Sequence, residues 1–573
     1  MSSQDASTRE IDTVASPVLS DRSPVLGEIF PVPAKLRTIL SDDVAQRFEW
    51  RYYLRREGKG RQKQVTHVGR KMKVNGDITL AIEFDRESYN ETIFDKNQIP
   101  LLPVHYDNLG HPLSWQPTQN LTPVELVYDR FGRLVKWQRG HLTETYSFDM
   151  SGRLADVRYS DGKGIMYKYD ESSISVPTEI ILPSGSRYIL QYDVSGSLQA
   201  VITPNGHKHE IATQTSIGFY KILYLAPGVG HPYVMHFNDR GQILAKLYPK
   251  NKGRVVYVYT EEGKLGSILC GQERTDYYYH NSTALVKSVT KNVPGLDTRM
   301  DYRHHGSLVK EERHRYNSRS GLDGAKFRYH YEGRLSSVEI EINGKTSITT
   351  KYRYNTESGI LEQVQQFLVH RPKMNSIFIQ DEARQYSKTI GTDSYGRLIV
   401  LGITLYNKEM FSLSLKYDNR SRVKQTHTKL GKDYVMFSSN YTYTSDGFLE
   451  EVSGAQSWRF IYDINGNMKS IWEGPRQISL RHDEGDRLIG YGDIELYLVD
   501  ARGFIIQRGG EKFKFNAIGQ LVHAFGKDQY EVHYFYDAED RLIARKDHKG
   551  NITQFMYADP KHPKLITHMH YPK

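Results

Sequence analysis

The amino-acid sequence predicts an all-β protein in which consecutive antiparallel hairpins coil into a large shell or barrel, of which this chain forms part. Three observations lead to this fold class. A short phrase recurs along the chain, mostly at a spacing of about 20 residues. The composition includes 41 tyrosines, which favour strands, and 46 glycines, which favour turns. No segment carries an apolar stripe with helical spacing over three turns.

The recurring phrase is an aromatic residue, Asp or Asn, two variable residues, Gly, a polar residue, and then Leu or Ile. Clear copies occupy residues 128–134 (YDRFGRL), 148–154 (FDMSGRL), 192–198 (YDVSGSL), 462–468 (YDINGNM) and 536–542 (YDAEDRL). The chain length alone would suggest about three or four domains. A period of this kind instead indicates a repeat architecture, in which each unit buries its apolar face only against its neighbours.

The chemistry of the phrase is that of a hairpin turn. The aromatic residue ends one strand with its ring on the buried face, and Asp accepts a backbone N–H bond from two residues further on. Gly takes the left-handed conformation that a type I turn with a bulge requires, and Ser421, Asp486 and Asp540 replace it in three copies. The following Arg-Leu pair starts the return strand, with Leu inward and Arg outward. The predicted structural turn residues are Tyr128, Asp129, Gly132, Phe148, Asp149, Gly152, Tyr192, Asp193, Gly196, Tyr462, Asp463, Gly466, Tyr536 and Asp537.

The segments between turns alternate as strands should. Residues 458–463 (WRFIYD) place Trp458, Phe460 and Tyr462 on one face. Neighbouring hairpins therefore form one long antiparallel sheet, and because sheets twist, the sheet is expected to close into a wide hollow shell. We predict a polar, disordered segment over residues 1–44 and the repeat shell over residues 45–573.

Charge and cysteine content limit the classes of function. The net charge is +10, and a basic cluster at residues 59–73 raises the hypothesis of a nucleic-acid or membrane-surface contact. A solvated strand pair is favoured instead, because basic residues elsewhere are scattered among acidic ones, so no nucleic-acid partner is predicted.

The single cysteine, Cys270, excludes an internal disulfide and a Cys-rich metal site, and is expected to be buried and inert. No apolar run approaches the roughly 20 residues of a membrane span, and the N-terminus lacks a signal-peptide core.

Sequons offer a mild argument for secretion. Possible N-glycosylation sites are Asn90, Asn281, Asn419, Asn440 and Asn551, whereas Pro123 weakens a further sequon at Asn120.

The sequence predicts no catalytic, cofactor-binding or metal site and therefore no enzyme. The recurring Asp residues are needed by every turn, so none stands out as a catalytic carboxylate. Histidines cluster at His304, His305, His562, His568 and His570 without the tight spacing of metal ligands. Exposed aromatic rings could stack on a glycan, but tyrosines lining the shell interior are the favoured interpretation.

These repeats resemble the YD repeats of teneurins and of bacterial Rhs and toxin-complex shell proteins. Longer matches make the resemblance to teneurins more specific, at residues 48–56 (FEWRYYLRR), 69–75 (GRKMKVN), 106–115 (YDNLGHPLSW), 458–467 (WRFIYDINGN), 486–492 (DRLIGYG) and 555–559 (FMYAD). The similarity covers roughly residues 45–573, and its departures suggest a divergent invertebrate member or a fragment.

The resemblance implies a non-catalytic adhesion scaffold on the extracellular face of the plasma membrane, within a single-pass type II protein. Teneurins carry EGF-like repeats, form homodimers, bind one another and latrophilin-type adhesion receptors, and act in neuronal development, axon guidance and synapse organisation. The chain is expected to stop before the Rhs-associated core and the toxin-like domain of the family. Two alternatives stay open, namely an Rhs-like shell enclosing a C-terminal toxin or peptide, and a carbohydrate-binding repeat protein.

Overall fold

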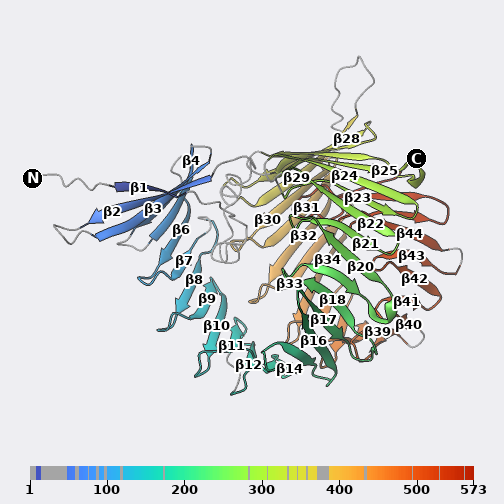
Figure 1. The fold of residues 1–573 in the computed structure, drawn as a ribbon, viewed down its shortest axis with the longest axis horizontal. Coiled ribbons are helices and arrows are strands. Elements are labelled where there is room, and N and C mark those ends of the chain that lie inside the picture. The colour runs from blue at the N-terminus through green and yellow to red at the C-terminus, as the bar shows by residue number, and fades with distance from the viewer. Residues whose placement is uncertain are drawn as a thin grey trace, which may run out of the picture.

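A computed structural model gives the fold of the chain (Figure 1). It describes residues 8–13, 48–57, 64–74, 77–85, 90–95, 100–116, 120–171, 175–281, 284–305, 308–331, 335–344, 346–356, 359–370, 386–431, 435–492, 495–527, 530–560 and 562–572. Of the segment predicted to be disordered, only Thr8–Thr13 is described, as strand β1, and it pairs with β2. The remainder of residues 1–44 lies outside the described residues.

The first part of the chain runs from β1 into a wall of short strands. These are β1 (Thr8–Thr13), β2 (Phe48–Glu57), β3 (Gln64–Val74), β4 (Asp77–Asp85), β5 (Asn90–Asp95), β6 (Pro100–Tyr106), β7 (Pro112–Trp115), β8 (Val124–Tyr128), β9 (Leu134–Arg139), β10 (Leu142–Phe148), β11 (Leu154–Tyr159), β12 (Gly164–Lys168), β13 (Glu179–Ile181), β14 (Arg187–Tyr192), β15 (Leu198–Ile202), β16 (Lys208–Ser216), β17 (Phe219–Leu225), β18 (Tyr233–Asn238), β19 (Ile243–Leu247), β20 (Arg254–Tyr259), β21 (Leu265–Cys270), β22 (Glu273–Tyr279) and β23 (Val286–Val293).

The second part continues the same pattern. Its strands are β24 (Leu296–His305), β25 (Leu308–Tyr316), β26 (Ala325–Tyr331), β27 (Leu335–Ile342), β28 (Thr346–Tyr354), β29 (Leu361–His370), β30 (Tyr386–Thr392), β31 (Leu398–Leu405), β32 (Lys408–Tyr417), β33 (Val423–Leu430), β34 (Val435–Tyr443), β35 (Leu449–Gly454), β36 (Trp458–Tyr462), β37 (Met468–Glu473), β38 (Arg476–His482), β39 (Leu488–Tyr491), β40 (Glu495–Val499), β41 (Ile505–Arg508), β42 (Glu511–Phe515), β43 (Leu521–Phe525), β44 (Glu531–Tyr536), β45 (Leu542–Asp547), β46 (Ile552–Met556) and β47 (His568–His570).

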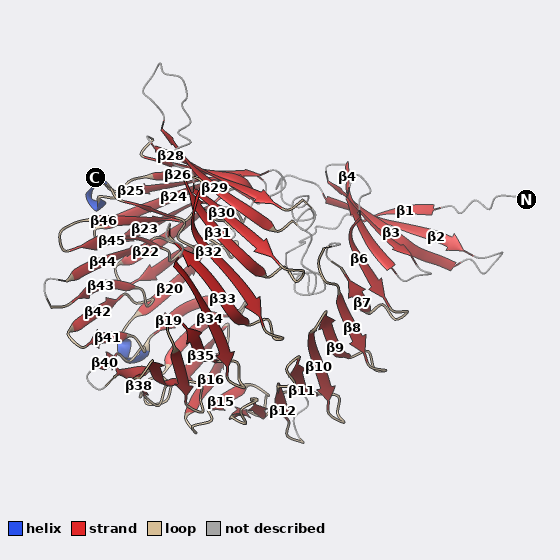
Figure 2. Cartoon of the chain, turned by 180° about the vertical axis from the view of Figure 1, so that it is seen from behind, coloured by secondary structure: helices blue, strands red, loops and turns tan. Residues whose placement is uncertain are grey.

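The topology is a continuous meander. Across the described residues the 47 strands form one antiparallel sheet in which each strand pairs with its neighbours in sequence, as in the β8–β9, β9–β10 and β10–β11 pairings. The helical elements described are two single 3₁₀ turns, η2 (Pro249–Asn251) and η3 (Ser318–Ser320). No helix in the described part of the chain is long and apolar enough to cross a membrane. The predicted fold class, an all-β spiral of hairpins, is confirmed (Figure 2).

The wall coils so that later strands lie beside earlier ones. We call β8–β29 the first wrap and β30–β47 the second wrap. Strands β41–β44 lie next to β20–β23 in both views (Figures 1 and 2). Hydrogen bonds join the wraps at matching points: the Thr122 N–H donates to the Ser394 carbonyl at 2.8 Å, and the Ser184 N–H donates to Asp446 Oδ1 at 2.7 Å. The spiral thus stacks one layer of hairpins on the preceding one.

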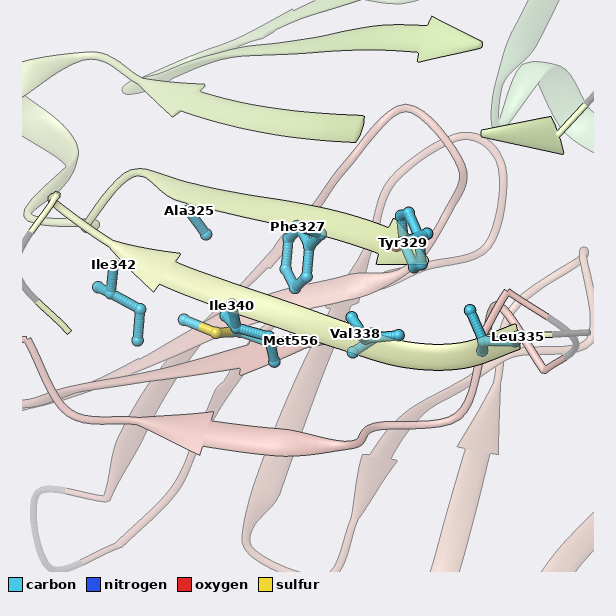
Figure 3. Packing of buried hydrophobic residues seen from close by; sticks show 9 residues of the cluster. Ala325, Phe327, Tyr329, Leu335, Val338, Ile340, Ile342 and Met556 are labelled. Atoms are coloured by element: carbon cyan, nitrogen blue, oxygen red, sulfur yellow. The ribbon is translucent and has the colours of Figure 1, made fainter. Parts of the chain in front are cut away.

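The apolar core lies where long strands of the first wrap cover the end of the second. Alternate residues of β26 and β27 face the same side, so that Phe327 opposes Ile340 and Tyr329 opposes Val338. Figure 3 shows these side chains converging, with Met556 of β46 beside them. Phe327, Val338 and Ile340 are completely buried. The period of two that places every second side chain on one face therefore builds this core.

Part of the predicted basic cluster falls in this wall. Residues 64–73 belong to β3, which pairs with β2 on one side and β4 on the other. Residues 59–63 lie outside the described residues.

Candidate functional site: the repeat turns and the contact between wraps

Every predicted turn residue occupies the end of a strand or the turn that follows it. Tyr128, Phe148, Tyr192, Tyr462 and Tyr536 are the last residues of β8, β10, β14, β36 and β44. The Asp residues follow directly, and Gly132, Gly152, Gly196 and Gly466 have φ values of 76°, 83°, 82° and 90°. Ser421, Asp486 and Asp540, which replace Gly, hold the same left-handed conformation with φ near 60° (61°, 60° and 60°).

The turn at Asp149 illustrates the geometry of the turns in which Arg follows Gly. The Gly152 N–H donates to the Asp149 carbonyl at 3.0 Å, closing the turn, and a register shift next to Phe148 marks the bulge. Asp149 Oδ1 accepts the Arg153 N–H at 2.8 Å, while Asp149 Oδ2 accepts the Arg153 Nε–H at 2.7 Å. A single carboxylate therefore satisfies both the backbone and the guanidinium of the residue that starts the return strand.

The arginine does not point outward into solvent, as the alternation of faces alone suggested. Besides its bond to Asp149, the Arg153 guanidinium stacks on the Tyr169 ring of the next repeat at 4.5 Å. Arg422 pairs with Asp418 and covers Tyr443 in the same way, at 4.6 Å. The physical reason is local. The ion pair with the carboxylate and the contact with the neighbouring ring together stabilise the guanidinium more than hydration does.

In several repeats a tyrosine hydroxyl connects the repeat to the one before it. The Tyr169 hydroxyl donates to the Leu154 carbonyl at 2.8 Å, and the Tyr462 hydroxyl donates to the Leu449 carbonyl at 2.7 Å. The hydroxyl reaches the residue that opens the return strand of the preceding unit, which explains the preference for Tyr over Phe at this position. Tyr169 is thus held to the preceding repeat twice, by its hydroxyl bond to Leu154 and by the Arg153 guanidinium over its ring.

The second and sixth positions of the phrase pair with each other, a contact that was not predicted from the sequence. Where Asn replaces Asp, Gln replaces Arg: Asn238 Nδ2–H donates to Gln242 Oε1 at 2.8 Å, and Asn516 donates to Gln520 at 2.8 Å. An ion pair is exchanged for a neutral amide pair of the same shape. This joint change between copies was visible in the sequence and identifies the pair without a structure.

We expect acid to loosen the turns. The Arg153 backbone N–H, together with its guanidinium, holds the pKa of Asp149 below its usual value, and the Ser195 hydroxyl does the same for Asp193. Because these pKa values are lower in the folded chain, the stability they contribute is complete above the unfolded value of about 4 and is lost as the pH falls below it. The melting temperature should decline between about pH 5 and pH 3.

A double substitution separates this effect from general acid sensitivity. Asp149→Asn with Arg153→Gln copies the natural pair of Asn238 and Gln242 and removes one titrating group. Its melting temperature should fall less steeply with pH than that of the unmodified chain. Equal slopes would show that the turn carboxylates do not control acid stability.

The turn at Asp537 differs from the others because it is buried between the wraps. It packs on first-wrap strands and forms what we call the inter-wrap ionic cluster, made of Lys291, Glu312, His314, Asp537 and Arg541. Arg541 donates from Nε to Asp537 Oδ2 at 2.7 Å and from Nη2 to Glu312 Oε1 at 3.1 Å. His314 Nε2 lies 2.5 Å from Glu312 Oε1, and Lys291 Nζ donates to the Asp537 carbonyl at 3.2 Å.

Interactions within the cluster favour the ionised forms of Glu312 and Arg541. Burial alone would raise the pKa of Glu312, but His314 and Arg541 outweigh it and lower that pKa to about 2. Burial would also favour loss of the Arg541 proton, yet Asp537 and Glu312 raise the pKa of the guanidinium instead. Because each charged group has partners of opposite charge, the cluster fixes the Asp537 turn of the second wrap against strands of the first wrap.

The predicted glycosylation sites differ in accessibility. Asn281, Asn419, Asn440 and Asn551 are exposed, whereas Asn90 is half-buried and its Oδ1 lies 2.8 Å from His105 Nδ1. Asn419 sits in a repeat turn, directly after Asp418.

The histidines and the cysteine noted in the sequence lie at several places in the fold. His304 and His305 end β24, His562 lies 2.9 Å from Asp559, and His570 lies 2.7 Å from Asp323. Burial lowers the pKa of His568 to about 4. Cys270 is buried at the end of β21, and burial raises the pKa of its thiol. A different group, His523, Glu531 and His533, comes together on adjacent strands and was not singled out from the sequence.

A polar cavity of about 630 Å³ lies between the wraps. Asn205 and His207 line it from the first wrap, and Asp463, Asp483 and Arg487 line it from the second. Asp463 and Asp483 are committed to their own turns: Asp463 accepts the Asn467 N–H at 2.9 Å, and Asp483 accepts the Arg487 Nε–H at 2.7 Å.

Comparisons with known proteins agree with this geometry. The family model "Teneurin YD-shell" matches residues 1–573. Teneurin-m of Drosophila melanogaster is 41% identical over 567 residues, covering 97% of this chain and 21% of that protein. Teneurin-3 of Danio rerio is 32% identical over 529 residues, covering 91% of this chain and 19% of that protein, and Teneurin-4 of Homo sapiens is 30% identical over 552 residues, covering 95% and 20%. The chain therefore spans about a fifth of the length of these relatives.

Solved structures of bacterial toxin shells are also similar to the chain. A crystal structure of TcdB2-TccC3 has a TM-score of 0.44 and 11% identity, covering 89% of this chain and 40% of that one. A Tc holotoxin pore of Photorhabdus luminescens has a TM-score of 0.43 and 12% identity, covering 91% and 32%. With turn chemistry, spiral topology and a family match along its whole length, the chain belongs to the teneurin family and is a stretch of its YD-shell.

Proposed function

We propose that this chain is part of a non-catalytic extracellular scaffold for cell adhesion, which binds a latrophilin-type receptor or a second teneurin. The observation that supports this function best is the family match over all 573 residues, together with polar side chains that are committed to turns and wrap contacts. The roles in neuronal development, axon guidance and synapse organisation, and the homodimeric state, are proposed on the same family ground.

One edge of the second wrap offers a surface for such a partner. Exposed apolar side chains gather at the hairpin ends of β31–β32 and β33–β34, and we call this group the apolar rim. Its members are Leu405, Tyr406, Leu430, Val435 and Met436. Adjacent exposed apolar groups of this kind favour protein contacts over solvent. A rigid sheet also holds them in fixed positions, which lowers the ordering cost of binding.

The test is binding of the purified chain to cells that display a latrophilin-type receptor or a teneurin. Met436→Glu, which places a charge in the apolar rim, should weaken binding by at least about tenfold. Met150→Glu is the matched control, because Met150 is fully exposed in a turn of the first wrap and should leave binding unchanged.

Three results would count against parts of this proposal. Absence of binding to both kinds of cell by a folded chain would contradict the adhesion function. Equal loss of binding in both variants would contradict the location at the apolar rim. Binding to a glycan array without binding to either receptor would support the carbohydrate-binding alternative instead.

An extracellular location predicts sugar at the exposed sequons. When the chain is secreted from eukaryotic cells, we expect glycans at Asn419 and Asn440, which are exposed, and little or none at Asn90, which is half-buried. Mass spectrometry after enzymatic deglycosylation measures the occupancy of each site. Occupancy at Asn90 with none at Asn419 would contradict this ranking.

A further inference from the structure

A histidine–carboxylate group lies on one face of the hairpin formed by β43 and β44. His523 is directly opposite His533 in the strand register, and Glu531 precedes His533 by two residues, so all three side chains share a face. The two imidazole rings are parallel, with an interplanar angle of 4° and centroids 4.2 Å apart. Phe525, opposite Glu531, stacks on the other side of His523 at 4.8 Å. His523 is therefore held in place between two rings.

Both histidines direct the same ring nitrogen to one carboxylate oxygen. His523 Nε2 lies 2.9 Å from Glu531 Oε1, and His533 Nε2 lies 3.2 Å from the same atom. The ligand atoms of the three residues all lie within 4.8 Å of one another. Three potential metal ligands thus converge on a common point.

The geometry points to a binding site for one divalent transition-metal ion, with Zn²⁺ as the favoured ion. Two imidazole nitrogens and a carboxylate oxygen are a donor set that suits zinc, at about 2.0–2.2 Å from each ligand. Binding requires the two stacked rings to tilt, because an imidazole nitrogen binds a metal in the plane of its ring. The hard ions Ca²⁺ and Mg²⁺ prefer oxygen ligands and are not expected here.

The surroundings leave room for the remaining ligand. Glu531 and His533 line a cavity of about 630 Å³ that is bordered by Leu296 and Arg319 of the first wrap. Both side chains are 44–46% exposed, so water reaches the site and completes a tetrahedral shell. A bound ion would join β43 to β44 and stabilise the hairpin, because it binds the folded arrangement alone.

The test is calorimetric titration of Zn²⁺ into the complete chain, with Ca²⁺ titrated in parallel. We expect one Zn²⁺ per chain, a higher melting temperature with Zn²⁺, and no comparable binding of Ca²⁺. His523→Ala and His533→Ala should each weaken binding by at least about 100-fold, since loss of an outer-shell partner alone costs 10–100-fold. Cobalt titrated in place of zinc should give the visible absorption of a four-coordinate centre that contains nitrogen ligands.

The matched control is His330→Ala. His330 is also an exposed strand histidine, 3.7 Å from the carboxylate of Glu339, but the second partner of that carboxylate is Arg328 and not a histidine. Zinc affinity should be unchanged in this variant, and the melting temperature of each variant without metal shows that it folds. Unchanged zinc affinity in His533→Ala, equal binding of Ca²⁺, or absence of zinc binding by the unmodified chain would each overturn the inference.

Discussion

Replacing Arg541 by Ala is expected to destabilise the shell by about 3–5 kcal/mol, because it leaves buried carboxylates without their cation. The Arg541 side chain is only 3% exposed and contacts Asp537 at 2.7 Å and Glu312 at 3.1 Å. Once the guanidinium is removed, the buried Asp537 loses its charged partner and Glu312 retains only His314, while both carboxyl groups stay in a site that excludes water. Urea denaturation of the chain measures the loss of unfolding free energy, and hydrogen exchange should show faster exchange in β25 and β45.

Arg133→Ala is the matched control for this substitution. Arg133 holds the same position in its own turn and pairs with Asp129 at 2.7 Å, but its side chain is 30% exposed. Its removal should cost no more than about 1 kcal/mol, since exposed ion pairs contribute little. Similar losses in the two variants would mean that burial between the wraps does not strengthen the pair.

Replacing Phe327 by Ala is expected to cost about 3–5 kcal/mol through loss of buried apolar surface and formation of a cavity. Phe327 is completely buried, opposite Ile340 and within the group of residues that includes Met556 (Figure 3). Because Met556 belongs to the second wrap, the cavity would loosen the contact between wraps as well as the β26–β27 hairpin. Urea denaturation measures the size of the effect.

Phe131→Ala provides the comparison. Phe131 is 67% exposed in the turn after β8, so its replacement should change the unfolding free energy by less than about 1 kcal/mol. Equal effects at Phe131 and Phe327 would contradict the assignment of the core to β26 and β27.

The turns show how far local sequence can be interpreted. The alternation of apolar and polar residues, the turn residues and the spacing of about 20 residues were enough to predict strands that end at Tyr128 and Tyr462. The reason is that the hydrogen bonds within such a turn join residues no more than about four positions apart. The same reasoning placed Arg153 in solvent, since it considered the faces of one strand and not the ring of the following repeat. In one copy of the phrase Asn238 and Gln242 replace Asp and Arg together, and this joint replacement indicates that the second and sixth positions contact each other.

The contacts between wraps had no comparable signal. Asp537 resembles every other turn aspartate in sequence, and only the structure shows that its turn packs on Glu312 and Lys291. The convergence of His523 with His533 likewise depends on the register of one hairpin.

The sequence by itself determined the repeat unit, the antiparallel order of its strands and the alternation of side chains along them. These properties follow from interactions between near neighbours, and they persist in any arrangement of the hairpins. Only the tertiary structure decided which turn of the second wrap meets which strand of the first. The alignment of the two wraps depends on the total twist of the sheet, which accumulates over many strands. The sequence of a single repeat does not specify that total.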